Sequence, residues 1–390
     1  MKKKLLILAV AGLALAACSS DETVASQATS EANAISFRPL MNNVTRATPL
    51  VPQDLSSSEG FFVTATFTTD GGSLYFSDKQ YKKKTVDPYN WAPWNNSTSS
   101  FYTIYWPNTT ADVLDFHAYA RHQTKSSQLS VDNTYVSSEN GCPRYTVTPA
   151  AEAANQIDFV YATLVNQDYQ NTNMELTFGH KESQVGVKLY NSDNELKFTV
   201  SEVSICNIVS SGTFKNRDNS PATTTTMGWG DFDFENLTNY SQTGLNIQHY
   251  NQTVAADAGT TWILIPHTLA KPVNDGQYVS AETNEVYGGA YIKVKYKCQS
   301  NINQDIYYAG GSSSWVEGIW PISDNINTTT WVAGTHYTYT IDLAGGGYYE
   351  RNQATPSGAT LDRILNLNPI TFATVTVSGW GDPSNTNVNM

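Results

Sequence analysis

Short runs of residues that alternate apolar and polar with a period of two, or that read as buried strands, recur from residue 60 to near the end of this chain, and they restrict the fold more than any other feature. Such alternation places every second side chain on one face of an extended strand. It predicts strands at 60–67, 101–107, 113–120, 174–178 and 184–190, then at 197–200, 203–209, 261–266, 290–298, 337–343 and 371–380. No run of helical periodicity longer than about ten residues stands out. We therefore expect an all-β protein.

The residue usage and the length point to two domains of this class. Only 15% of the 390 residues are charged, and there are 23 tyrosines, a usage that favours strands and turns. A polar stretch with turn-forming residues occupies 191–195 and divides the chain near its middle. The economical prediction is two antiparallel β-sandwiches in tandem, at 47–195 and 196–390.

The first residues have the form of a bacterial export signal. Residues 2–4 are lysines and residues 5–16 are apolar and uncharged, a stretch shorter than the roughly 20 residues that span a bilayer. We therefore predict a cleavable signal over 1–17. Residues 15–18 read Leu-Ala-Ala-Cys, a lipobox pattern that predicts acylation of Cys18 and an outer-membrane, cell-surface lipoprotein. The acidic run that follows is either a surface-export signal or a solvated tether.

A short strand precedes the first predicted domain. Residues 34–41 place Ile35, Phe37 and Met41 on one face, while Pro39 confines the strand to an edge because proline cannot donate to a ladder. The next segment is loop-like and contains Arg46. We expect the bond between Arg46 and Ala47 to be open to proteases.

Charge and cysteine content exclude several classes of protein. The formal net charge is −12; residues 1–46 contribute +2, so a chain that starts at Ala47 carries −14. An acidic chain without basic clusters argues against nucleic acid as a partner. Cys142, Cys206 and Cys298 lack metal-ligand spacing. Buried free thiols are favoured, although one disulfide is an alternative.

Candidates for catalysis or metal binding have ordinary structural explanations. Asp115 and His117 share one strand face near His122, without a signature for a third ligand or a nucleophile; a hydrogen-bonded structural or surface histidine is favoured. The carboxylates of residues 231–235 could hold a hard cation, but a strand with one wet face is favoured. We predict no enzyme activity, cofactor or metal.

Exposed aromatic residues provide a different kind of candidate. Trp229 and Trp315 lie in glycine-rich sequences that we expect to form flexible loops. Aromatic rings of this kind bind sugars or partner proteins, although most tryptophans fill cores. These two residues therefore support an alternative function in carbohydrate binding.

Several short sequences, taken in order, resemble the fimbrillin family of type V pilus subunits. They follow the lipobox at Cys18 and read AISF (34–37), TRAT (45–48), YWP (105–107), LDFHAYA (114–120), LTFGHKESQVGVKL (176–189), WILIPH (262–267), WVAGTHYTYTIDL (331–343) and VTVSGW (375–380). The resemblance spans nearly the whole chain. It implies two transthyretin-like β-sandwich domains in an exported lipoprotein.

The resemblance also implies a route of assembly. An arginine-specific protease would cut after Arg46 and release the lipidated leader, residues 18–46. Ile35, Phe37 and Met41 would fill a groove until then, and a strand from another pilus subunit would replace them. The implied partners are pilus subunits, the protease, a host or bacterial receptor, and the outer membrane through lipid.

The end of the chain departs from the family pattern. Stalk subunits donate a C-terminal extension, whereas here Trp380 is followed by a polar tail. The candidate donor residues are Val375, Val377 and Trp380 in the last predicted strand, and Val388 in the tail. The chain is thus either a stalk subunit with a weak donor or, as we favour, a tip or accessory subunit that only accepts a strand.

The sequence also leaves room for two other classes of function. A carbohydrate-binding surface lipoprotein would stay anchored through Cys18 and bind glycans through Trp229 and Trp315. A secreted hydrolase would need a carboxylate pair or a triad, and no pair in the sequence has distinguishing context. The hydrolase is disfavoured.

Overall fold

The structure is a computed structural model of the 390-residue chain. It describes residues 33–41, 60–68, 72–84, 91–107, 112–121, 126–134, 136, 141–171, 174–217, 226–249, 256–269, 289–322, 330–345, 348–350, 361–363, 374–379 and 386–388. For several strands of the second half, only the backbone is described.

The first half is built on one sheet that closes on itself. Its strands are β1 (Phe37–Met41), β2 (Phe61–Phe67), β3 (Leu74–Lys83), β4 (Trp91–Asn95), β5 (Ser100–Phe101), β6 (Leu114–Arg121), β9 (Phe159–Gln167) and β10 (Met174–His180). The order is β1-β10-β9-β6-β2-β3-β4-β5. A bridge between Phe37 and Trp91 joins β1 to β4 and completes the ring. Apolar side chains of these strands fill the interior.

The second half is a sandwich of two sheets. One sheet has the order β17-β11-β21-β24-β25 and the other β15-β12-β18-β20-β22-β23, while β16 pairs with β12 and β19 with β18. The first contains β11 (Ser183–Tyr190), β17 (Ala256–Leu264), β21 (Thr335–Asp342), β24 (Thr374–Gly379) and β25 (Thr386–Val388). The second contains β12 (Leu196–Val209), β15 (Leu237–Gln242), β16 (Ile247–His249), β18 (Tyr291–Ser300), β19 (Tyr307–Ala309), β20 (Val316–Pro321), β22 (Tyr348–Glu350) and β23 (Leu361–Arg363). One continuous hydrophobic core lies between them.

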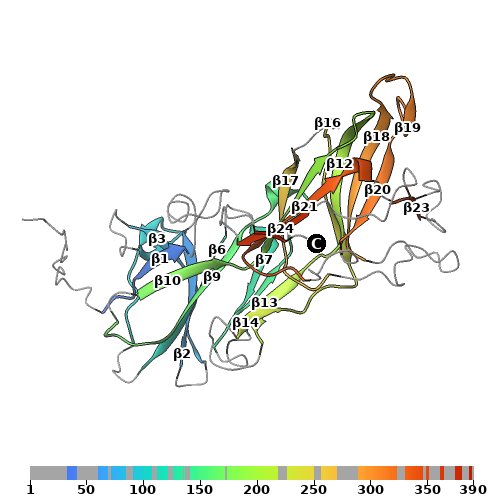
Figure 1. Ribbon diagram of the computed structural model, residues 1–390. Helices are drawn as coiled ribbons and strands as arrows, with labels where there is room; N and C mark the ends of the chain where they lie inside the picture. The colour runs from blue at the N-terminus through green and yellow to red at the C-terminus, as the bar shows by residue number, and fades with distance from the viewer. Residues whose placement is uncertain are drawn as a thin grey trace, which may run out of the picture.

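A third, four-stranded sheet joins the two halves (Figure 1). It pairs β7 (Leu129–Asp132) and β8 (Arg144–Val147) with β13 (Gly212–Asn216) and β14 (Met227–Gly230). Three 3₁₀ turns complete the described elements, at Ser126–Gln128, Ala153–Asn155 and Leu343–Gly345. The strands of this sheet come from both sides of residue 195. The domain limits stay a prediction, but the halves share backbone pairing.

The all-β prediction is confirmed, and two local predictions of strand are wrong. Regular strand ends at Phe101, and within 102–107 only Tyr105 pairs, through an isolated bridge to Ala34. Residues 231–235 are not a strand. Asp231 has a φ of 48°, and the Asp233 carboxylate accepts bonds from Asn236. Short acidic side chains that bond local backbone in this way compete with a ladder.

Other expectations from composition can be compared with the described residues. Cys142, Cys206 and Cys298 are buried and free, as favoured from the sequence. Burial raises the pKa of the Cys206 and Cys298 thiols to about 12, so both are thiols at neutral pH. Over the described ranges, no helix is long and apolar enough to cross a membrane, and no cluster of metal-ligating side chains occurs.

Candidate functional site

Strand β1, the strand of the predicted leader, lies inside the ring of the first half. It runs parallel to β10 over five consecutive pairs, from Phe37 opposite Met174 to Met41 opposite Phe178. Figure 1 shows β1 in blue beside β10. A strand from the start of the chain is thus held against a strand that lies far along the sequence, with no described covalent link nearby.

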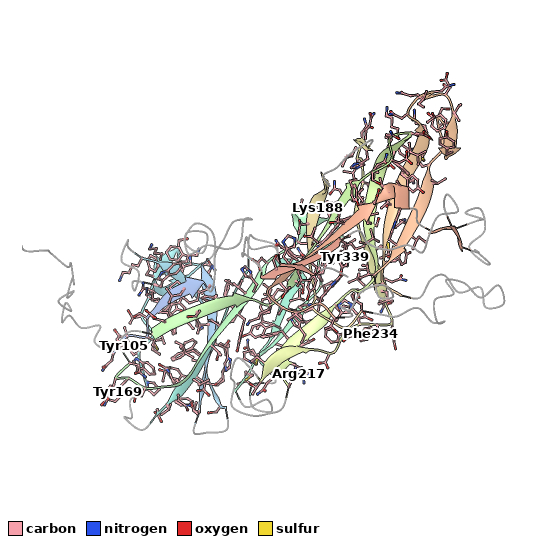
Figure 2. All side chains as sticks on the ribbon, viewed as in Figure 1. Tyr105, Tyr169, Lys188, Arg217, Phe234 and Tyr339 are labelled. Atoms are coloured by element: carbon pink, nitrogen blue, oxygen red, sulfur yellow. The ribbon has the colours of Figure 1, made fainter. Side chains whose placement is uncertain are left out.

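The second edge of β1 is paired only at its beginning. The Ile35 N–H donates to the Ile104 carbonyl (2.8 Å), and the Asn33 carbonyl accepts the Trp106 N–H (2.9 Å). Tyr105, labelled at the first-half end of the molecule in Figure 2, lies between these two contacts. On this edge the pairing of the described residues ends at Phe37 opposite Trp91.

Pro39 occupies the position where its missing N–H costs least. N–H groups two residues apart in a strand point to the same edge, so Pro39 faces the same way as Ile35 and Phe37. That direction is away from β10, past the last described pair. The ladder with β10 therefore uses the N–H groups of Arg38 and Leu40, and Pro39 removes neither of them.

The inward side chains of β1 are part of the core, as the sequence predicts. Ile35 is 1% exposed and Phe37 is 0% exposed, and Pro39 is also buried. The Phe37 ring meets Tyr81 at 5.0 Å, Phe116 at 5.1 Å and Phe61 at 6.2 Å between centroids. The side chain of Met41 lies outside the described residues. These contacts make Ile35 and Phe37 part of the hydrophobic core of the first half.

The outward face of β1 carries an exposed ion pair with β10. Arg38 Nη1 lies 2.9 Å from Glu175 Oε1, and the two side chains are 35% and 43% exposed. Exposed ion pairs of this kind contribute about 1 kcal/mol or less. The strength of the site therefore comes from the ladder and from the buried side chains of β1.

The last strands of the chain form a hairpin on their own sheet. β24 pairs with β21 and also with β25, with Val375 opposite Val388 and Val377 opposite Thr386. Val377 packs against the second-half core. Of the other predicted residues, Cys18, Arg46, Ala47 and Trp380 lie outside the described part of the chain. Two of the candidate donor residues, Val375 and Val388, are thus paired with each other in the β24–β25 ladder. They belong to a different sheet from β1.

The predicted aspartate and histidine pair has a structural role. Burial lowers the pKa of His117 to about 4, and its Nδ1 lies 2.7 Å from the Tyr161 hydroxyl. Asp115 accepts bonds from the Thr68 hydroxyl (2.8 Å) and the Asn166 N–H (2.7 Å). His122 lies outside the described residues. Both described side chains hold strands together, in line with the favoured interpretation.

The prediction that Trp229 is exposed in a loop is wrong. Trp229 lies in β14, is 9% exposed, and packs against Phe159 and Phe214. Its indole N–H donates to the Lys181 carbonyl. Pairing of β14 with β13 turns the ring inward, which removes it from any sugar-binding surface. Trp315 lies under the Lys297 ammonium, 4.5 Å from the ring centroid.

Sequence reasoning missed a buried group of ionisable side chains at the joint between the halves. Asp158 and His180 are in contact (3.0 Å) and almost fully buried. Glu182 is 0% exposed and accepts the Phe159 N–H (2.7 Å). Lys181 and Glu182 form the connection between β10 and β11, while His180 ends β10 and Ser183 begins β11. An ionisable Glu directly before an apolar strand is the only signal that the sequence offers.

The pKa of Glu182 predicts a dependence of stability on pH. Burial, with a further contribution from Asp158, raises this pKa well above its usual value of 4.5. The folded state then binds the proton more tightly than the unfolded state, so stability falls as pH rises from about 4.5 towards the folded-state pKa. We expect Glu182→Gln to remove this fall, as measured by urea unfolding between pH 4.5 and 8. Exposed Glu195→Gln is the control, and an unchanged slope in Glu182→Gln would contradict the assignment.

Backbone contacts fix the connection around Glu182. The Lys181 N–H donates to the Phe159 carbonyl (3.0 Å), and the Gly334 N–H donates to the Glu182 carbonyl (2.8 Å). The Ser183 hydroxyl donates to the Val332 carbonyl (2.8 Å). The two-residue connection between β10 and β11 is therefore tied to both halves, together with the shared sheet.

The chain was compared with known proteins. A family model described as fimbrillin-like matches residues 45–380, and no curated protein matches. A cell adhesion protein from Bacteroides uniformis is similar at 14% identity and a TM-score of 0.41, covering 90% of this chain and 99% of that one. A cell adhesion protein from Parabacteroides distasonis has 11% identity, a TM-score of 0.44, and coverage of 90% and 98%.

A third solved structure is a fimbrial assembly protein from Parabacteroides distasonis. It has 12% identity and a TM-score of 0.32, and the match covers 84% of this chain and 99% of that one. The family model spans every residue from Arg46 to the end of β24, and so most of the chain. The resemblance drawn from short ordered motifs is thereby confirmed, and this chain belongs to the fimbrillin-like family.

Proposed function

We propose that this chain is a fimbrial subunit that is exported as a lipoprotein through Cys18 and assembled by strand exchange. An arginine-specific protease cuts after Arg46, β1 leaves with the leader, and a strand of another subunit takes its place. Family membership indicates a fimbrial or adhesive role at the cell surface, with other pilus subunits as partners. The anchoring in the outer membrane, the cut and the exchange are the proposal.

The observation that carries the proposal is the placement of β1. It precedes Arg46 in the sequence, it belongs to the core of the first half, and its described contacts are non-covalent. A cut after Arg46 would leave Phe37 and Ile35 attached only by packing and ladder bonds. Departure of the strand would expose the edge of β10 and the aromatic groove, a surface that only another strand can fill well.

The C-terminal hairpin supports an accessory or tip role. β24 lies between β21 and β25 in its own sheet, and donating it would break both pairings. The contact proposed for β1 is heterologous, so a subunit that both accepts and donates extends a filament. A subunit that accepts without donating ends one. The second function considered, carbohydrate binding, loses one of its two aromatic candidates because Trp229 is buried.

Removing the cleavage residue tests the proposal at the cell surface. In the wild-type strain we expect the N-terminus of the fimbrial protein to be Ala47, by intact mass. Arg46→Lys, which an arginine-specific protease does not cut, is expected to keep the chain lipidated at Cys18 and out of fimbriae. Arg38→Lys, in the same leader, is the matched control and is expected to be processed normally. A lipidated Cys18 as the only form in wild type would contradict stalk and tip roles alike.

A further inference from the structure

The position of Phe37 in the groove is shaped for an aromatic ring. Tyr81, Phe116 and Phe61 surround it, with interplanar angles of 71°, 79° and 72°. These are edge-to-face contacts, which aliphatic side chains do not make. All three surrounding rings are fully buried in the presence of β1. A smaller side chain at this position would leave a cavity among them.

Phe37 is also the point where the groove holds both edges of the strand. It faces Met174 on β10 and Trp91 on β4. Beyond it, towards Met41, the described ladder continues on the β10 edge alone. Three aromatic rings therefore limit how far a side chain at this position enters the core, and pairing with β10 and β4 fixes the register of its backbone. The other inward positions, those of Ile35 and Pro39, accept aliphatic side chains.

The rim of the groove carries a negative charge directly after this position. Glu175 on β10 is opposite Arg38, with which it forms the 2.9 Å ion pair. When β1 leaves, the Glu175 carboxylate stays on the exposed strand edge. An incoming strand that runs parallel to β10 in the same register presents its next residue to this carboxylate.

Building on the proposed strand exchange, we propose that the groove selects its partner strand by two features. The strand carries an aromatic ring at the position of Phe37 and a basic residue immediately after it. The ring provides most of the affinity, and the basic residue sets the register against Glu175. The partner is thus a subunit strand of the pattern apolar, any residue, aromatic, basic, apolar, running parallel to β10.

The chain's own C-terminal residues satisfy this pattern only in part. The sequence Ile370-Thr371-Phe372-Ala373 has the spacing of Ile35-Ser36-Phe37-Arg38, but alanine stands in place of the arginine. Val375 and Val377, further along, are followed at the same spacing by Gly379 and supply no ring. A copy of this chain would therefore bind less tightly than a strand that meets both requirements.

Competition between peptides tests the selection without altering the fold of the protein. The full chain is cut after Arg46 with an arginine-specific protease, the cut is verified by mass, and uptake of a fluorescein-labelled peptide of residues 33–41 is followed by anisotropy. Among unlabelled competitors, the Phe37→Ala peptide is expected to bind at least about 100-fold more weakly. The Arg38→Ala peptide is expected to bind about threefold more weakly. The Ser36→Ala peptide is the control and is expected to match the parent.

A charge exchange completes the test. Glu175→Lys protein is expected to bind the Arg38→Glu peptide better than the parent peptide, which reverses the order seen with the wild type. Equal binding of the parent and Phe37→Ala peptides would overturn the ring requirement, and an unreversed order would overturn the role of Glu175. Failure of the cut protein to take up any peptide would instead contradict strand exchange itself.

Discussion

Phe37→Ala is expected to destabilise the first half of the uncut protein by about 3–5 kcal/mol. The ring is wholly buried and has three aromatic neighbours within 6.2 Å, so its removal leaves a cavity that rigid rings cannot close. The measurement is chemical unfolding followed by tryptophan fluorescence, because Trp91 and Trp106 lie in the same core. In the cut protein, the same substitution is expected to speed loss of the leader.

Leu40→Ala is the matched control for this prediction. Leu40 lies on the same strand but on its outward face, where it is half-buried. Its truncation is expected to cost less than about 1 kcal/mol. Equal effects of the two substitutions would mean that β1 lies on the surface of the closed sheet and does not fill its interior.

Locking β1 to β10 is expected to abolish assembly while leaving the fold intact. Arg38 and Glu175 are opposite each other in the ladder, and neighbouring strands lie about 4.8 Å apart, within the Cα separation that a disulfide accepts. We expect the Arg38→Cys/Glu175→Cys protein, once oxidised, to be cut after Arg46 and to keep its leader strand. Its incorporation into fimbriae is expected to fall below detection and to return on reduction.

Each single cysteine variant controls for the loss of the ion pair. Arg38→Cys alone is expected to assemble normally, because an exposed ion pair contributes little and residue 38 leaves with the leader. Glu175→Cys alone is expected to assemble with its affinity for the partner strand lowered about threefold, the same loss expected for the Arg38→Ala peptide. The outcome is read by surface fractionation and by the mass of the leader under non-reducing conditions. Normal assembly of the oxidised double variant would show that β1 need not leave, and would contradict strand exchange.

The sequence was sufficient for the class of fold and for one face of the leader strand. Alternation over residues 34–41 correctly placed Ile35 and Phe37 inside, because a period of two needs only local spacing. Pro39 predicted an edge strand, whereas β1 is paired on its second edge up to Phe37 opposite Trp91; Pro39 follows that pair. These features depend on residues that are neighbours in the chain.

The arrangement of strands could not be derived in the same way. Pairing of β13 with β8 joins Phe214 to Tyr145, and nothing local in either segment specifies the other. The burial of Trp229 has the same character, because its ring packs on Phe159, a residue far from it in the sequence. The pairing of Phe37 with Trp91, which closes the first-half sheet, also depends on residues far apart in the sequence. Glu182 was missed because burial of a carboxylate is decided by packing from β9 and from the residues before β21.

The four-stranded sheet between the halves also bears on how a fibre would bend. β7 and β8 share ladders and a hydrophobic core with β13 and β14. Bending the subunit between its two halves would therefore break hydrogen bonds of this sheet and open that core. A junction between two subunits that is held by one exchanged strand would have fewer such hydrogen bonds and core contacts. A filament of these subunits would therefore consist of rigid subunits, and it would bend mainly at the junctions between them.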